Sequence, residues 1–239
     1  MNRDAWRVLR EVQTAWTQAI HHVKQICQSS DVRPQMPAQV FTLDTNAADD
    51  YVKLSVGPVV FHVNERPSRP GPNLFIVVTG WMSFEGPNFK TLPFHTRDFG
   101  TEVAYFRVKQ DRLEHIFAAH YDMDDSDYRH PVFHAQLASH MDSSEHVRSF
   151  FSQDREVTNN MNKVLRTVRI PTAQMDVFSV LIQVCADHLI GQQPAPSTTS
   201  AFEDLKTASS FFVGAGNRFE YLHTAPAPNC YRASHWYNT

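Results

Sequence analysis

Two alternating segments on either side of a short polar loop constrain the fold of this chain most. In residues 113–123, and again in 130–140, apolar and polar side chains alternate, which is typical of strands with one buried face. The stretch MDDSDYR that joins them is rich in aspartate and serine, residue types that favour turns. We therefore predict an antiparallel hairpin over this part of the chain.

Strict alternation assigns the side chains of this hairpin to two faces. In the first strand, one face would hold Leu113, His115, Phe117, Ala119 and Tyr121, and the other Glu114, Ile116, Ala118, His120 and Asp122. In the second strand, one face would hold His130, Val132, His134, Gln136 and Ala138, and the other Pro131, Phe133, Ala135 and Leu137. A register that buries Phe133 and Leu137 would bring His120 and Asp122 near His134 and Gln136.

The candidate functional residues all come from this hairpin: His120, Asp122, His130, His134 and Gln136. Imidazole and carboxylate groups could hold a divalent metal such as Zn²⁺ or Mn²⁺, with His120, Asp122 and His134 as the ligands. The same side chains could act as a general acid and base, because histidine titrates near neutral pH. A third interpretation is structural, with the histidines hydrogen-bonded in a half-buried sheet. The spacing leaves all three interpretations open.

The sequence lacks the short motifs that identify common enzyme classes. It contains no HExxH, GxSxG, CxxC, GxGxxG or GxxxxGK[ST] segment. A net charge of −3 argues against nucleic-acid binding by bulk electrostatics, although Lys163, Arg166 and Arg169 could form a local basic patch. Three widely spaced cysteines and the absence of a long apolar run predict a soluble, cytoplasmic protein without a membrane contact.

The N-terminal segment 3–29 carries one apolar stripe at steps of three and four residues, which predicts an amphipathic helix. The stripe consists of Ala5, Leu9, Val12, Trp16, Ala19, Val23 and Ile26. We favour docking of this stripe on the sheet of the same chain. The alternative is a contact with a protein partner or with a second copy of the chain.

The whole pattern predicts one α+β domain over 1–239, built on a mainly antiparallel sheet. Its parts are the helix at 3–29, the sheet at 39–170, C-terminal helices at 171–212 and a tail at 213–239. Before the hairpin, we predict strands at 39–43, 51–56, 59–63, 74–79 and 102–108, with a loop or short helix at 80–100. After it, we predict a helix from Pro171, a linker at 192–199, and a helix from a capping box at Ser200 to about Phe212.

Four short motifs give the chain a resemblance to known families. They are His120-Tyr121-Asp122, His130-Pro131 with His134 and Gln136, Arg169 with Pro171-Thr172, and Asp187-His188. This pattern resembles uncharacterised bacterial protein families that lie in genome-defence or toxin–antitoxin neighbourhoods. The resemblance implies a prokaryotic protein of antiviral defence that contacts nucleic acid or a protein partner.

Two functions follow as hypotheses. The first is a phosphodiester hydrolase, nuclease-like, that acts on a nucleic acid or nucleotide through the histidine and aspartate residues of the hairpin. The second is a non-catalytic interaction subunit that binds a protein partner through its N-terminal helix. The hydrolase requires the histidine face to be open to solvent, whereas the interaction subunit allows these histidines to be packed away.

Overall fold

In a computed structural model of the chain, the described residues are 3–28, 33–35, 41–46, 51–63, 73–85, 96–109, 112–123, 133–138, 147–148, 157–159, 169–172, 175–191 and 193–209. The helices are α1 (Arg3–Gln28), α3 (Val177–Val184) with the π-helical turn η2 (Cys185–Leu189), and α4 (Pro196–Ser209). The strands are β1 (Arg33–Gln35), β2 (Phe41–Asn46), β3 (Tyr51–Val63), β4 (Leu74–Glu85), β5 (Thr96–Lys109), β6 (Arg112–Met123), β7 (Phe133–Ala138), β8 (Val157–Asn159) and β9 (Arg169–Pro171).

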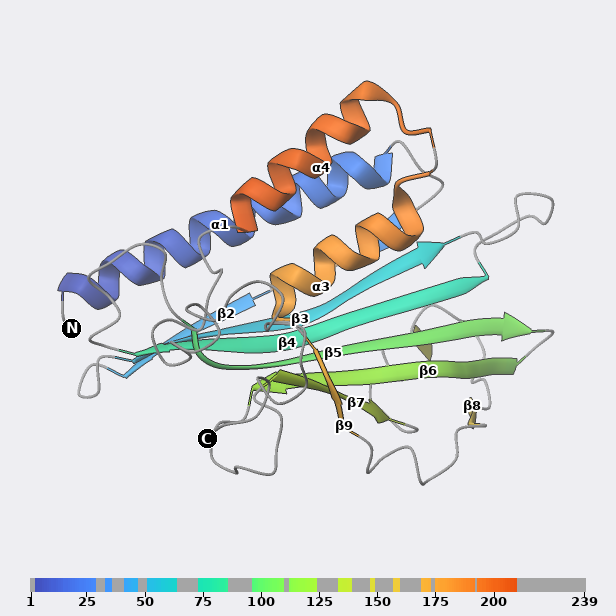
Figure 1. Ribbon diagram of the computed structural model, residues 1–239, viewed down its shortest axis with the longest axis horizontal. Coiled ribbons are helices and arrows are strands. Elements are labelled where there is room, and N and C mark those ends of the chain that lie inside the picture. Colours follow the sequence, from blue (N-terminus) through green and yellow to red (C-terminus); the bar gives the residue numbers. More distant parts are fainter. Residues whose placement is uncertain are drawn as a thin grey trace, which may run out of the picture.

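The described strands form one sheet in the order β1-β3-β4-β5-β6-β7-β9, with β2 paired to β3 and β8 paired to β6. All of these pairings are antiparallel except that of β8 with β6. The predicted α+β class is therefore confirmed, as is the meander of three strands that ends in the predicted hairpin. Helices α1, α3 and α4 lie together on one side of the sheet (Figure 1). We call the opposite side the outer face.

The apolar stripe of α1 packs inside the chain. Val12, Trp16, Ala19, Val23 and Ile26 are all buried in the core between the helices and the sheet. The ring of Trp16 meets that of Phe178 on α3 edge to face, with the centroids 5.5 Å apart. The predicted helix is confirmed, and its stripe takes the docked arrangement.

The predicted loop or short helix at 80–100 is wrong at both ends, because β4 continues to Glu85 and β5 begins at Thr96; residues 86–95 lie outside the described part. Gly80 interrupts no strand. A Cβ atom built there would lie 2.5 Å from Cγ1 of Val177, so the missing side chain leaves room for α3 on the sheet. The strands predicted at 51–56 and 59–63 are likewise one strand, β3, with a register shift between Val56 and Val59.

Strict alternation fails at one position in β6. Tyr105 on β5 is opposite Phe117, but the next residue, Phe106, is opposite His115, so Ile116 has no cross-strand neighbour on β5. Such a β-bulge reverses the facing of every residue on one side of it relative to the other. Leu113 lies in the outer apolar cluster together with Ala118, whereas Ala119 and Tyr121 lie in the helix-side core. The predicted shared face of Leu113 and His115 with Phe117, Ala119 and Tyr121 is therefore wrong.

The C-terminal helices begin elsewhere than the sequence pattern indicated. Asp176 lies before the first turn of α3 and caps it, with its Oδ1 accepting from the N–H groups of Phe178 and Ser179 at 3.0 Å each. Helix α4 begins at Pro196, within the predicted linker, because proline suits the first helical position. Ser200 is inside α4 and caps nothing at its start.

Several predictions fall on residues outside the described part. These are the last residues of the predicted helix to Phe212 and the tail at 213–239. The basic patch of Lys163, Arg166 and Arg169 lies there too, apart from the backbone of Arg169 in β9.

Thr101 should tolerate the loss of its hydroxyl. Its side chain is fully buried, and its Oγ1 has no hydrogen-bond partner within the described residues. Because a buried polar group without a partner costs desolvation energy, we expect Thr101→Val to raise the free energy of unfolding by about 1 kcal/mol. Urea denaturation measures this, with Thr17→Val as the control: the Thr17 hydroxyl donates to the Gln13 carbonyl at 2.8 Å, so no gain is expected. A loss of stability in Thr101→Val would contradict the prediction.

Candidate functional site

The candidate residues lie side by side on the outer face of β5, β6 and β7. His120 in the middle strand is opposite Glu102 on β5 and Gln136 on β7. Two residues further along, Asp122 is opposite Gly100 on one side and His134 on the other. The predicted proximity of His120 and Asp122 to His134 and Gln136 is confirmed. His130 lies outside the described residues.

Four of these side chains form a continuous chain of alternating carboxylate and imidazole groups. Oε1 of Glu102 lies 3.6 Å from Nδ1 of His120, and Nε2 of His120 lies 3.3 Å from Oδ2 of Asp122. The other carboxylate oxygen of Asp122, Oδ1, lies 2.7 Å from Nε2 of His134. At the far end, the hydroxyl of Thr79 donates to Oε2 of Glu102 at 3.5 Å. We call Glu102, His120, Asp122 and His134 the carboxylate–imidazole chain.

Solvent access falls steadily along the carboxylate–imidazole chain. The side chain of Glu102 is 44% exposed, those of His120 and Asp122 are 34% and 31% exposed, and that of His134 is 1% exposed. Glu102 and His120 can therefore touch a bound molecule. His134 is instead buried, and it holds the carboxylate of Asp122 in place, as buried residues behind a site commonly do.

The contacts within the chain shift the pKa values so that opposite charges coexist at neutral pH. Hydrogen bonding to Asp122 and then to Glu102 raises the pKa of His120 to about 9. Hydrogen bonding from His120 lowers the pKa of Glu102. Burial alone would raise the pKa of Asp122, but the hydrogen bonds and charges of His120 and His134 outweigh burial and lower it. At pH 7, an imidazolium thus lies between two carboxylates.

A surface pocket of about 260 Å³ opens at the exposed end of the carboxylate–imidazole chain. Its lining residues come from β3, β4, β5 and β6 and are Ser55, Thr79, Gly80, Trp81, Gly100, Glu102 and His120. The Nζ atom of Lys53 lies 4.4 Å from the centroid of the Trp81 ring, which is cation–π distance. The pocket therefore combines a carboxylate, an imidazolium, two hydroxyl groups and an aromatic ring beside an ammonium group.

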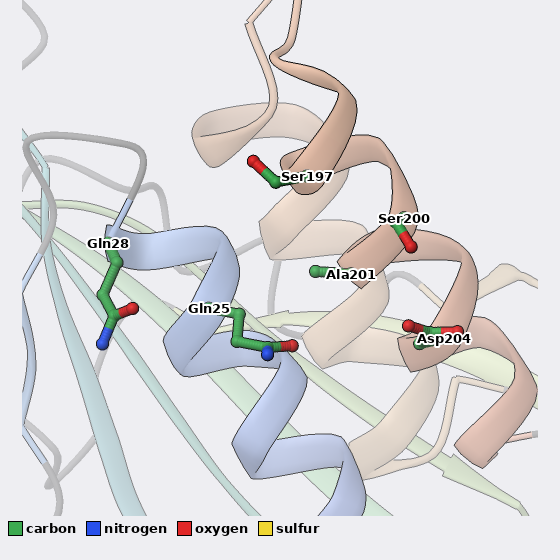
Figure 2. Close-up of a pocket in the computed structure, with 6 residues that line it drawn as sticks. All are labelled: Gln25, Gln28, Ser197, Ser200, Ala201 and Asp204. Carbon is green, nitrogen blue, oxygen red and sulfur yellow. The ribbon is translucent and has the colours of Figure 1, made fainter.

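A second, larger pocket of about 500 Å³ lies between the end of α1 and the start of α4. Figure 2 shows Gln25 from α1 and Asp204 from α4 extending into the space between the two helices, with Ser197 and Ser200 above them. The described residues that line it contribute amide, hydroxyl and carboxylate groups, and no histidine is among them. We therefore place the chemistry at the smaller pocket on the sheet, where acid and base groups meet.

Sequence reasoning missed Glu102. Its side chain alternates into the outer face of β5, but nothing in the local sequence indicates which residue of β6 lies opposite it. The proposed metal ligands His120, Asp122 and His134 are adjacent, yet both histidines direct Nε2 at the carboxylate of Asp122. Among the described residues, no group of three or more His, Cys, Asp or Glu side chains has the arrangement of a metal site.

Comparisons of the chain with protein-family models, curated proteins and solved structures find no match. The resemblance to families of genome-defence neighbourhoods stays a prediction. No helix in the described ranges has the length and apolar character needed to cross a membrane.

Proposed function

We propose that this chain is a phosphodiester hydrolase, nuclease-like, in which Glu102 and His120 act as base and acid. The observation that supports this most is the pairing, in one pocket, of a carboxylate with a lowered pKa and an imidazole with a pKa of about 9. At neutral pH the first can accept a proton and the second can donate one. Phosphodiester cleavage needs both transfers, one at the attacking oxygen and one at the leaving oxygen.

The remaining members of the chain have positioning roles in this proposal. Asp122 contacts Nε2 of His120 and stabilises its protonated form, while the buried His134 contacts the other oxygen of Asp122. Gln136 is the cross-strand neighbour of His120 on β7, and in this proposal it helps to position His120. A role for His130 stays a prediction from the sequence, as does a divalent metal held by His120, Asp122 and His134.

Replacing His120 with glutamine should lower kcat at least about 100-fold, because the variant has no proton to deliver to the leaving oxygen. Hydrolysis of bis(p-nitrophenyl) phosphate by the full chain measures this, and wild-type activity should fall as the pH rises through about 9, where His120 loses its proton. His21→Gln, at an exposed position of α1, is the matched control and should keep full activity. Equal activity of both variants would refute the role of His120.

The interaction-subunit hypothesis takes a narrower form. Because the apolar stripe of α1 is buried, a protein partner or a second copy would have to use a part of this helix outside the stripe, where Trp6 is 51% exposed. That tryptophan is the one observation that favours this second function. A Trp6→Ala variant that loses self-association in light scattering at unchanged stability would support it, and a wild-type chain that is monomeric at every concentration would argue against self-association.

A further inference from the structure

We propose that the exposed side of the first turns of α1 binds a single-stranded nucleic acid, by its phosphates and one unpaired base. Four residues form this surface, Arg3, Trp6, Arg7 and Arg10, and we call them the arginine–tryptophan patch. The proposal is separate from the hydrolase, because α1 lies on the helix side of the sheet (Figure 1), whereas the pocket at Glu102 lies on the outer face.

The four residues of the arginine–tryptophan patch share one side of the helix. Residues three and four apart lie next to each other on an α-helix, and positions 3, 6, 7 and 10 follow this spacing. The side chains of Arg3 and Arg10 are exposed, that of Trp6 is 51% exposed, and that of Arg7 is half-buried. An indole ring at the surface thus has a guanidinium group one helical turn before it and another one turn after it.

The acidic residues near the patch are on other sides of α1 or at its other end. Asp4 and Glu11 follow Arg3 and Arg10 directly, so each lies about a quarter of a turn away from the patch. Helix α4 has 14 residues against 26 in α1, and it begins beside the end of α1, where Asp204 lines a pocket with Gln25. Figure 1 shows the N-terminal turns of α1 continuing past the end of α4. The arginines therefore keep a positive surface around Trp6.

Charge and aromatic character together indicate the chemistry of the partner. Guanidinium groups bind phosphate oxygens through two parallel N–H bonds. An exposed aromatic ring stacks on unpaired bases with little dependence on their identity. A single strand presents phosphates and unpaired bases side by side, so one base can stack on Trp6 while neighbouring phosphates contact Arg3 and Arg10. A duplex keeps its bases paired and would leave the indole without a partner.

Other partners fit the patch less well. A stable protein interface needs an apolar core, but Trp6 is the one exposed large apolar residue among the described side chains of α1. An amphipathic helix on a membrane inserts its apolar side, and that side of α1 is buried in the core. In a symmetric dimer, a second copy would bring the same arginines face to face, and like charges repel.

The net charge of −3 restricts the contact with a polyanion to this patch. The number of phosphate contacts should therefore be small, and it can be measured from the salt dependence of binding. Each contact with a single strand changes the slope of log K against log salt by about −0.7, so three arginines predict a slope of about −2.

The test measures binding of a fluorescein-labelled oligo(dT) strand to the full-length chain by fluorescence anisotropy at several salt concentrations. Arg10→Gln should weaken binding and make the slope less steep by about 0.7, because one phosphate contact is lost. The matched control is Lys24→Gln, which removes one exposed positive charge near the other end of the same helix. Its Kd and its slope should equal those of the wild type.

A variant of Trp6 tests the stacking contact separately from the charges. Trp6→Ala should raise Kd about tenfold and leave the salt slope unchanged, because the ring contributes stacking and no phosphate contact. Trp6→Phe should restore most of the affinity. Urea denaturation should give all of these variants the stability of the wild type, since the substituted side chains are exposed.

Several outcomes would overturn the proposal. The first is a wild-type chain that does not bind the strand, and the second is an unchanged Kd and slope in both Arg10→Gln and Trp6→Ala. A loss of affinity in Trp81→Ala but not in Trp6→Ala would place the strand at the pocket. Binding to phosphatidylserine vesicles instead of the strand, lost in Trp6→Ala, would assign the patch to a membrane surface. Hydrolysis of bis(p-nitrophenyl) phosphate tests the hydrolase independently, because that assay does not use the patch.

Discussion

Replacing Gly80 with alanine should lower the free energy of unfolding by about 3 kcal/mol or more. The new methyl group would lie 2.5 Å from Cγ1 of Val177 and 2.6 Å from the carbonyl oxygen of Gly100. The valine could shift, but the carbonyl belongs to the backbone of the neighbouring strand and has little freedom. Overpacking at a rigid contact is among the more destabilising changes that one methyl group can cause. Equilibrium urea denaturation measures the difference from wild type.

The control for this variant is Gly191→Ala. Gly191 is exposed, and no atom would lie within 4 Å of an added Cβ. Its stability should therefore change by less than about 0.5 kcal/mol. If Gly80→Ala were as stable as Gly191→Ala, the close approach of α3 to β4 and β5 would be wrong.

Replacing Asp122 with asparagine should lower the pKa of His120 from about 9 toward its ordinary value of 6.5. The amide carries no charge to stabilise the imidazolium, and only Glu102 remains. Because Asp122 is about one-third exposed, solvent screens part of its interaction, and we expect a loss of about 2 kcal/mol in the free energy of unfolding. NMR titration of the histidine ring signals gives the pKa, and urea denaturation gives the stability.

The pH dependence of this loss has a definite sign. The folded-state pKa of His120 is raised, so its stabilising contribution is complete below 6.5 and disappears as the pH rises through about 9. The pKa of Asp122 is lowered, so its contribution is present above its ordinary value of 3.8 and disappears at lower pH. The difference in the free energy of unfolding between wild type and Asp122→Asn should be largest between pH 3.8 and pH 6.5, where both contributions are present, and it should be smaller at pH 10.

Glu203→Gln is the control for Asp122→Asn, because it removes one partner of an ion pair whose side chains are both exposed. Glu203 lies 2.6 Å from Lys206 on the solvent side of α4, and both side chains are exposed. Such a surface pair should contribute less than about 1 kcal/mol. A loss in Asp122→Asn no larger than in Glu203→Gln would show that the carboxylate–imidazole chain adds little to the stability of the fold.

The elements that could be predicted from the sequence are those with a strong and uninterrupted period. The stripe of α1 repeats over seven turns, and the helix is found at Arg3–Gln28, within one residue of its predicted end. The hairpin of β6 and β7 was also predictable, because both runs alternate and their polar connection is short. The juxtaposition of His120 and Asp122 with His134 followed from that pairing.

What could not be predicted depends on contacts between distant segments. Gly80 resembles a strand end in the sequence, but it is a close-packing position beneath Val177 of α3, about a hundred residues later in the chain. Ser200 fits a capping box with Glu203, yet Pro196 starts the helix one turn earlier. In both places a local signal was present, and a competing constraint decided the structure.

Glu102 is the clearest case for the site. Lys109 is opposite Arg112 at the start of β6, and counting along both strands from this pair would place Ala119 opposite Glu102. The unpaired Ile116 shifts the register by one residue and brings His120 there instead. No local pattern in the sequence marks Ile116, so the base of the proposed reaction was not predictable.

The bulge at Ile116 also determines which side of the sheet the second half of β6 presents to solvent. If Ile116 paired regularly with Tyr105, His120 would lie opposite Thr101, and His120 and Asp122 would turn toward the helices while Ala119 and Tyr121 turned outward. Because Ile116 is left out of the pairing, the residues after it keep the opposite facing. One unpaired residue therefore decides whether the charged groups meet solvent or the hydrophobic core.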